Sequence, residues 1–153
     1  MDYLLELGMA LAKNIKRESQ RIVVVTGDGE INEGSIWEAA MCAGNHQLKN
    51  LSVFVDYNKI QSYGFTRDVA NLEPLSQKWE AFGFSVKEID GHDVAQLQSA
   101  VKQLPFDLNK PSAIICHTIK GKGFDFAENK PEWHHKSSLS EEDIQTMLNC
   151  LEM

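Results

Sequence analysis

Two oxygen-bearing side chains each stand three residues after the end of an apolar run of the sequence. Asp28 lies in the turn that follows Ile22-Val23-Val24-Val25, and Asn58 follows the run from 51 to 55. Carboxylate and amide oxygens are the ligands that hard cations prefer, and the main-chain oxygen around Ile60 offers another. A small set of oxygens that leaves positions for water and phosphate is typical of Mg²⁺ bound together with a diphosphate. We therefore predict a Mg²⁺–diphosphate site formed by Asp28 and Asn58, to which the main chain around Ile60 could add a further oxygen.

Gly27 and Gly29 flank Asp28 and allow the main chain to turn tightly and to approach a ligand closely. The helix expected after them, from about 33 to 47, points its first unpaired amides into the same space. A Gly-Asp-Gly sequence by itself is a common turn. Its position after an apolar strand is what favours a ligand site here.

The same residues fit part of the dinucleotide-binding fingerprint. Gly27 and Gly29 follow a strand, and Asp56 ends the next strand, where an acid that binds ribose would stand. The third glycine of that fingerprint is replaced by Asn32, and Gly34 comes too late. Because the other positions of the fingerprint match, a nucleotide-binding oxidoreductase remains an alternative. Mg²⁺-independent binding of NAD would reveal it.

The elements that position these residues form a strand–helix–strand unit, which is typical of a parallel crossover. The same patterns predict further strands at 84–89 and 113–116, and helices at 2–18, 72–82, 94–104 and beyond 140. We expect an α/β fold with a mostly parallel sheet flanked by helices, which binds ligands where its strands end. The first helix is expected to bury a face formed by Leu4, Leu7, Leu11 and Ile15.

The size and charge of the chain narrow the function classes. At 153 residues it is predicted to be a single domain over 1–153. The formal charge of −7 argues against a nucleic-acid or anionic-membrane partner, and no apolar run is long enough to span a membrane. Cys42, Cys116 and Cys150 are odd in number and lack metal-binding spacing, so we predict reduced thiols in a cytoplasmic protein.

Two segments of the sequence together resemble the thiamine-diphosphate signature of transketolases, Gly27-Asp28-Gly29 with its continuation to 40 and the segment 55–61. The similarity to the family extends through the segment 89–93, Lys120-Gly121-Lys122-Gly123 and Glu132-Trp133-His134. The resemblance covers nearly the whole chain and is closest to the N-terminal, diphosphate-binding subunit of split transketolases. It implies a thiamine-diphosphate-binding fold with thiamine diphosphate and Mg²⁺ as cofactors.

The resemblance also assigns roles to individual residues. Asp28, Asn58 and the main-chain oxygen of Ile60 match the residues that hold Mg²⁺ on the diphosphate. Glu33 matches a residue in a subunit-contact network that links paired active sites. His134 matches a residue that reaches the diphosphate and the reacting oxygens, which makes it the catalytic candidate.

The implied reaction is transfer of a two-carbon ketol unit from a ketose phosphate to an aldose phosphate, in a homo- or hetero-oligomer. The carboxylate that activates the aminopyrimidine lies in a separate, C-terminal pyrimidine-binding subunit, so this chain is expected to be inactive alone. Relative to the family, the sequence is expected to be truncated at its N-terminus, because it lacks a region that carries several histidines.

Two departures from the family pattern keep other functions open. Tyr63 stands where the family has an acidic residue near the cofactor, and His135 stands where it has glycine. These departures would fit another thiamine-diphosphate-dependent decarboxylase or carboligase. The missing N-terminal region would fit a truncated, non-catalytic assembly module. Lys120 and Lys122 lie on a glycine-hinged loop and are further candidates for phosphate contact.

Overall fold

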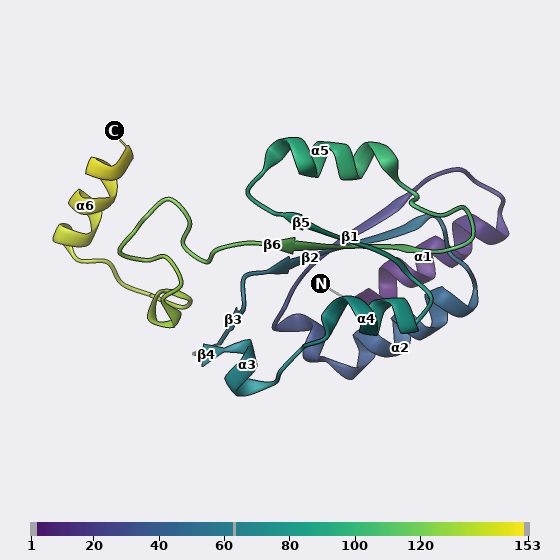
Figure 1. The fold of residues 1–153 in the computed structure, drawn as a ribbon, viewed down its shortest axis with the longest axis horizontal. Helices are drawn as coiled ribbons and strands as arrows, with labels where there is room; N and C mark the ends of the chain where they lie inside the picture. The colour runs from purple at the N-terminus through teal and green to yellow at the C-terminus, as the bar shows by residue number, and fades with distance from the viewer. Residues whose placement is uncertain (1–2, 63, 152–153) are drawn as a thin grey trace.

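The computed structural model describes residues 3–62 and 64–151 and contains a four-stranded parallel sheet (Figure 1). The strands lie in the order β1-β2-β6-β5. Their bounds are β1 (Ile22–Gly27), β2 (Leu51–Tyr57), β5 (Ser85–Asp90) and β6 (Ser112–His117). All four run in one direction, so their carboxyl ends meet at one edge of the sheet. The predicted α/β fold is confirmed.

Helices cover the two faces of the sheet unequally. Helices α1 (Tyr3–Ile15), α2 (Gly34–Asn45) and α4 (Leu75–Ala81) lie on one face, and α5 (Val94–Gln103) lies on the other (Figure 1). The larger core lies between the sheet and helices α1, α2 and α4, and it contains Leu7, Val53 and Trp79. The smaller core lies under α5 and contains Phe54, Leu104 and Ile114.

The position of each strand explains its pattern of burial. Strand β2 lies between β1 and β6, and every residue from Leu51 to Val55 is buried. Strand β1 is at the edge of the sheet, where Val24 is buried and Val23 and Val25 are 53% and 64% exposed. Helix α5 packs against β5 and contributes Leu97 to the core over β6, so the face of β1 that carries Val23 and Val25 is left uncovered.

A close contact between glycines fixes helix α2 against the turn that precedes β5. A Cβ atom on Gly44 would lie 1.7 Å from the main-chain oxygen of Phe82, and Gly83 follows with a φ of +88°. Only glycine allows the helix to approach this closely. The contact fixes the position of α2 relative to the turn before β5, and α2 in turn follows the Gly27–Gly29 turn.

The first helix is shorter than predicted and buries a different face. Tyr3, Leu7 and Ala10 are buried, whereas Leu4 and Ile15 are 44% and 80% exposed. Leu11 is partly buried against the core, so the prediction was right for Leu7 and Leu11 and wrong for Leu4 and Ile15.

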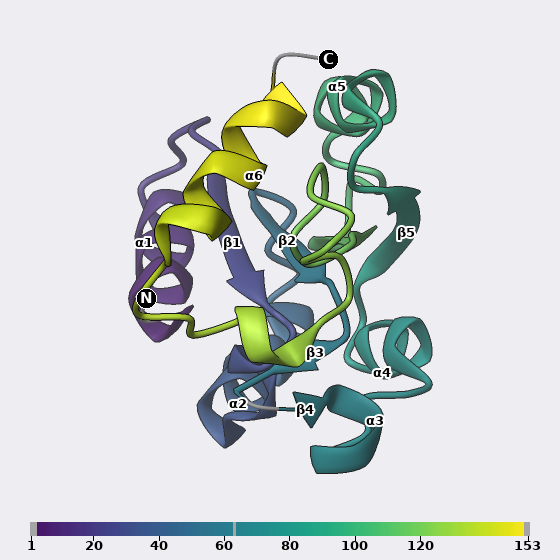
Figure 2. The same cartoon turned by 90° about the vertical axis from the view of Figure 1, so that its left-hand side faces the viewer.

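Most of the remaining elements lie beyond the carboxyl ends of the strands. Strands β3 (Ile60–Gln61) and β4 (Gly64–Phe65) form a small antiparallel pair followed by α3 (Thr66–Val69). The 3₁₀ turn η1 (Glu30–Asn32) links β1 to α2, and a second one, η2 (Pro131–Trp133), lies in the long loop after β6. Helix α6 (Glu141–Leu151) stands away from the sheet in Figure 1, and in Figure 2, which faces that side of the molecule, it lies in front of the sheet. Within the described ranges, no helix is long and apolar enough to cross a membrane.

Candidate cofactor and metal site

A cleft of about 360 Å³ opens at the carboxyl ends of β1 and β2. Six of the seven candidate site residues line it: Gly27, Asp28, Gly29, Asn58, Ile60 and His134. The exception is Glu33, which is exposed at the start of α2 and is not among the lining residues. The parallel register produces this convergence, because it places Gly27 beside Asp56 at the two strand ends.

Asp28 provides the buried carboxylate of the cleft. The residue is only 2% exposed, and its Oδ2 accepts a hydrogen bond of 2.5 Å from the main-chain amide of Lys59. Burial raises the pKa of Asp28 to about 6, against the opposing effect of hydrogen bonds from the amides of Lys59 and Gly29. A buried carboxylate with few donors around it is well suited to bind a cation.

Asn58 lies on the same turn that donates to Asp28. Its Oδ1 accepts a hydrogen bond of 3.0 Å from the amide of Ile60, and its Nδ2 donates to Oδ2 of Asp56 at 3.3 Å. Lys59, between the two ligand residues, adopts a left-handed conformation with a φ of 69°. Such a conformation is uncommon for a residue with a side chain, and it curls the turn around the carboxylate of Asp28.

His134 reaches the cleft from the loop after β6. Its Nδ1 atom is buried and has no hydrogen-bond partner in the part of the chain that the structure describes. Burial lowers the pKa of His134, and the nearby charges of Lys120 and His135 lower it further. Contact between the rings of Phe126 and Trp133, at 5.1 Å between centroids, helps to hold this loop. The imidazole is therefore neutral near pH 7 and has an unsatisfied nitrogen.

The two glycines of the turn have different roles. A Cβ atom on Gly29 would lie 3.0 Å from Cβ of Gln61, so the turn and β3 are in close contact there. A Cβ atom on Gly27 would have no heavy atom within 4 Å, so the cleft has open space beside this main chain. Gly29 thus allows the protein to close on itself, and Gly27 leaves room for a ligand.

These residues fit a metal-bound diphosphate. Among residues 3–62 and 64–151, no group of three or more His, Cys, Asp or Glu side chains could hold a metal ion. A single carboxylate, an amide oxygen and a main-chain oxygen would leave several positions for phosphate oxygens and water, which is the mode that Mg²⁺ prefers. The donor set and the open space beside Gly27 therefore both fit Mg²⁺ with a diphosphate.

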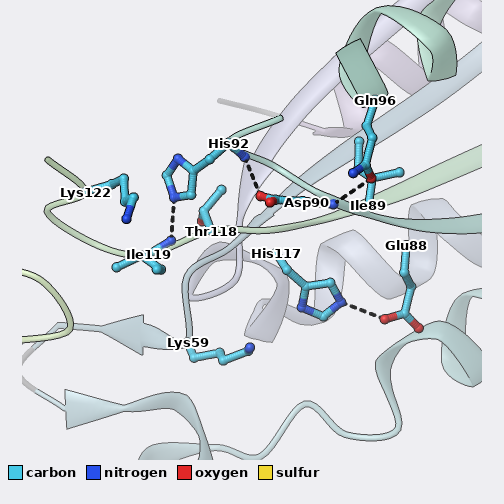
Figure 3. A pocket seen from close by; sticks show the side chains of 10 residues that line it. All are labelled: Lys59, Glu88, Ile89, Asp90, His92, Gln96, His117, Thr118, Ile119 and Lys122. Carbon is cyan, nitrogen blue, oxygen red and sulfur yellow. Dashed lines mark hydrogen bonds and ion pairs between the residues drawn. The ribbon is translucent and has the colours of Figure 1, made fainter. Parts of the chain in front are cut away.

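The cleft continues into a longer trough along the same edge of the sheet. A groove of about 510 Å³ shares Asp56, Asn58 and Lys120 with the cleft. It also shares His92, Thr118 and Lys122 with an outer groove of about 660 Å³ at the ends of β5 and β6 (Figure 3).

Several polar groups of the outer groove already have partners (Figure 3). His117 Nε2 lies 2.6 Å from Glu88, and the amide of Ile119 donates to His92 Nε2 at 2.8 Å. The cleft around Asp28 differs in that one of its lining residues, His134, has a buried ring nitrogen without a hydrogen-bond partner among the described residues.

Comparison with known proteins identifies the family. Residues 10–153 match the family model described as "Transketolase, thiamine diphosphate binding domain". The chain belongs to the transketolase family. It is 48% identical over 136 residues to a 6-deoxy-6-sulfo-D-fructose transketolase subunit of Clostridium sp.. It is 42% identical over 136 residues to an apulose-4-phosphate transketolase subunit of Actinobacillus succinogenes.

Each of these two alignments covers 89% of the chain but 49% of the relative, so this transketolase-family chain spans about half their length. Among solved structures, a transketolase from Campylobacter jejuni superposes with a TM-score of 0.75 and 31% identity. That superposition covers 83% of this chain and 21% of the other. The comparisons confirm the resemblance to transketolases and the thiamine-diphosphate-binding fold.

The structure of the transketolase-family chain places further residues in the cleft that the sequence pattern did not assign to it. They are Glu30, Asp56, Gln61, Ser62, Lys120 and His135. The pattern indicates other roles for two of them, a ribose-binding acid for Asp56 and a mobile phosphate contact for Lys120. The position of Asp56 at a strand end, two residues before Asn58, is the signal that could have found it. Tyr63, which stands where the family pattern has an acidic residue, lies outside the residues that the structure describes.

Proposed function

We propose that this chain is the diphosphate-binding subunit of a transketolase-like enzyme that uses thiamine diphosphate and Mg²⁺. The enzyme would transfer a two-carbon ketol unit between sugar phosphates. The observation that carries this proposal is one cleft, at the ends of β1 and β2, lined by Asp28, Asn58, Ile60 and His134. Membership of the transketolase family supports the same cofactor and the same class of reaction.

The proposed binding role falls to residues of the two strand ends. Asp28, Asn58 and the main-chain oxygen of Ile60 would hold Mg²⁺, and the space beside Gly27 would admit the diphosphate. Lys120 lines the same cleft and would offset part of the negative charge of the diphosphate. Glu33 is proposed to act at a subunit contact, which agrees with its exposed position at the start of α2.

When bound, thiamine diphosphate supplies the carbon nucleophile and the electron sink for breaking one C–C bond and forming another. This chain contributes orientation and proton transfer. His134 lines the cleft, and its neutral imidazole would accept a proton from a substrate hydroxyl or donate one back.

A second chain is part of the proposal. The Clostridium and Actinobacillus relatives are named as transketolase subunits, and this chain spans about half of each. We propose that a C-terminal transketolase subunit supplies the pyrimidine-binding module, in an oligomer that is inactive without it. The three cysteines are free thiols, which fits a cytoplasmic enzyme.

The substrate is proposed at the level of class. One relative is named for 6-deoxy-6-sulfo-D-fructose and the other for apulose 4-phosphate, so both names describe an anionic ketose. By analogy we propose an anionic ketose, with a sugar phosphate as the first choice, as the donor for this chain.

Two measurements test the proposal. Calorimetric titration with thiamine diphosphate, in the presence of candidate partner subunits, should show binding that requires Mg²⁺. Product analysis should then show ketol transfer between sugar phosphates rather than decarboxylation of pyruvate. Mg²⁺-independent binding of NAD would support a nucleotide-dependent enzyme instead. Cofactor binding without turnover, with every candidate partner, would support a non-catalytic assembly module.

A further inference from the structure

Asp56 contacts two of the three proposed cation ligands and a further segment of the chain. Its main-chain oxygen accepts a hydrogen bond of 3.2 Å from the amide of Asp28. Its side-chain Oδ2 accepts from Nδ2 of Asn58 at 3.3 Å, and Oδ1 accepts from the hydroxyl of Thr118. Asp56 thus joins the end of β2 to the end of β1 and to the segment that follows β6.

The chemistry of a carboxylate gives these contacts a direction. An ionised carboxylate can only accept hydrogen bonds, whereas the amide of an asparagine has a donor end and an acceptor end. Oδ2 of Asp56 therefore selects the NH₂ end of Asn58. The carbonyl oxygen of Asn58 must then point the other way, where it accepts a hydrogen bond of 3.0 Å from the amide of Ile60.

The hydrogen bond from Thr118 keeps Asp56 in place. Oδ1 is occupied by the hydroxyl of Thr118, so Oδ2 is the oxygen that remains for Asn58. Asp56 and Thr118 both line the groove that adjoins the cleft, and Thr118 is one of the residues drawn in Figure 3. The strand order makes this possible, because β6 lies directly beside β2.

We propose that Asp56 is a positioning residue that orients the amide of Asn58 so that its oxygen is available to the cation. The same orientation orders Ile60, whose main-chain oxygen is the third proposed ligand, through the bond from its amide to Asn58. This inference rests on the proposed function for the identity of the ligand. Partners of this kind typically change metal affinity by about 10- to 100-fold when they are removed.

The first test concerns the orientation and does not depend on any cofactor. In ¹⁵N NMR spectra of the full chain, the side-chain amide of Asn58 should exchange slowly with water, and Asp56→Asn should make that exchange fast. Asp90→Asn is the matched control, because Asp90 also ends a strand and accepts from a main-chain amide, that of His92. Unchanged protection of the Asn58 amide in Asp56→Asn would overturn the inference.

The second test measures the effect on the cation, with Mn²⁺ as the spectroscopic probe and thiamine diphosphate present. Binding of Mn²⁺, followed by electron paramagnetic resonance with the partner subunit present, should weaken about 10- to 100-fold in Asp56→Asn and less than about threefold in Asp90→Asn. Circular dichroism should show the same thermal midpoint for both variants. Loss of less than about threefold in Asp56→Asn would overturn the inference. If the wild-type chain with its partner binds no Mn²⁺ in the presence of thiamine diphosphate, the proposed function itself is wrong, whatever the variants show.

A charge-conserving exchange separates orientation from simple loss of charge. In the double variant Asp56→Asn with Asn58→Asp, an amide at 56 can donate to a carboxylate at 58, whose second oxygen faces the cation. This variant has the net charge of the wild type and should bind Mn²⁺ more tightly than Asp56→Asn. It should also bind more tightly than Asn58→Asp, in which two carboxylates face each other. A double variant no better than either single variant would contradict the orienting role.

Discussion

The carboxylate of Asp28 and the main-chain amide of Lys59 are joined by a hydrogen bond of 2.5 Å between Oδ2 and N. This bond links the turn after β1 to the turn after β2, which carries Asn58. Two segments separated in sequence by a helix thereby become one site. The effect of burial on the Asp28 carboxylate outweighs that of its amide donors and of Lys120, so an added divalent ion has a clear electrostatic role.

Replacement of Asp28 with Asn should abolish Mg²⁺-dependent binding of thiamine diphosphate. The amide has nearly the same shape as the carboxylate and can still accept from the amide of Lys59, but it lacks the charge that binds a hard cation. Affinity measured by calorimetry should fall by more than the roughly 10- to 100-fold that follows loss of a group supporting a metal ligand, because Asp28 is the only carboxylate among the proposed ligands. Unchanged affinity would remove Asp28 from the site.

The pH dependence of cation binding should follow Asp28. Its pKa in the folded, cation-free chain is about 6, and only the ionised form binds the cation. Apparent Mg²⁺ affinity should be constant above this pH and fall about tenfold for each pH unit below it. Calorimetry in buffers of different ionisation enthalpy should also show proton release on binding at acidic pH. An affinity that is flat across this range would contradict the assignment.

The same carboxylate should lower the stability of the cation-free chain at neutral pH. Because burial raises the pKa of Asp28 from 3.8 to about 6, the folded state binds its proton more tightly than the unfolded state does. The contribution of Asp28 to stability is therefore fully present below the unfolded pKa and is lost as the pH rises through the folded pKa. In urea unfolding at pH 7, Asp28→Asn should be more stable than the wild type. This difference should disappear at about pH 3.5, which lies below the pKa of Asp28 in both the unfolded and the folded state. A difference that persists unchanged at the acidic pH would assign it to another cause.

Replacement of His134 with Gln should lower kcat more than it changes cofactor affinity. A positioned acid–base group contributes about 10²- to 10⁴-fold to rate, and the neutral imidazole is the group of that kind proposed here. Steady-state kinetics with the partner subunit would measure the loss, and His46→Gln, at an exposed position after α2, serves as the control. Equal losses in turnover and in cofactor affinity would reduce His134 to a diphosphate ligand.

Much of the site could be predicted from the sequence because it depends on local order. Asp28 and Asn58 follow strands that are visible as apolar runs, and parallel strands place their ends together. The role of Asp56 could not be predicted in the same way, since its contact with Thr118 requires β6 to lie beside β2. Strand order is a property of the whole chain rather than of any one segment.

The first helix shows a second limit of the same kind. The spacing of its apolar residues correctly predicted a helix, but this spacing does not determine which face of the helix packs against the sheet. Tyr3 and Ala10 lie on the buried side with Leu7, whereas Leu4 and Ile15 do not. Strand β4 and helix α3 show a further limit, because elements this short leave little periodicity for the sequence to reveal.

The unpaired edge of strand β1 affects how this chain behaves at high concentration. In the described part of the molecule β1 ends the sheet, and Val23 and Val25 present apolar surface next to main-chain groups that no neighbouring strand covers. Such a flank invites pairing between molecules and therefore aggregation in concentrated samples. A lysine at position 23 should oppose that association, so light scattering from Val23→Lys should stay lower than from the wild type as concentration rises.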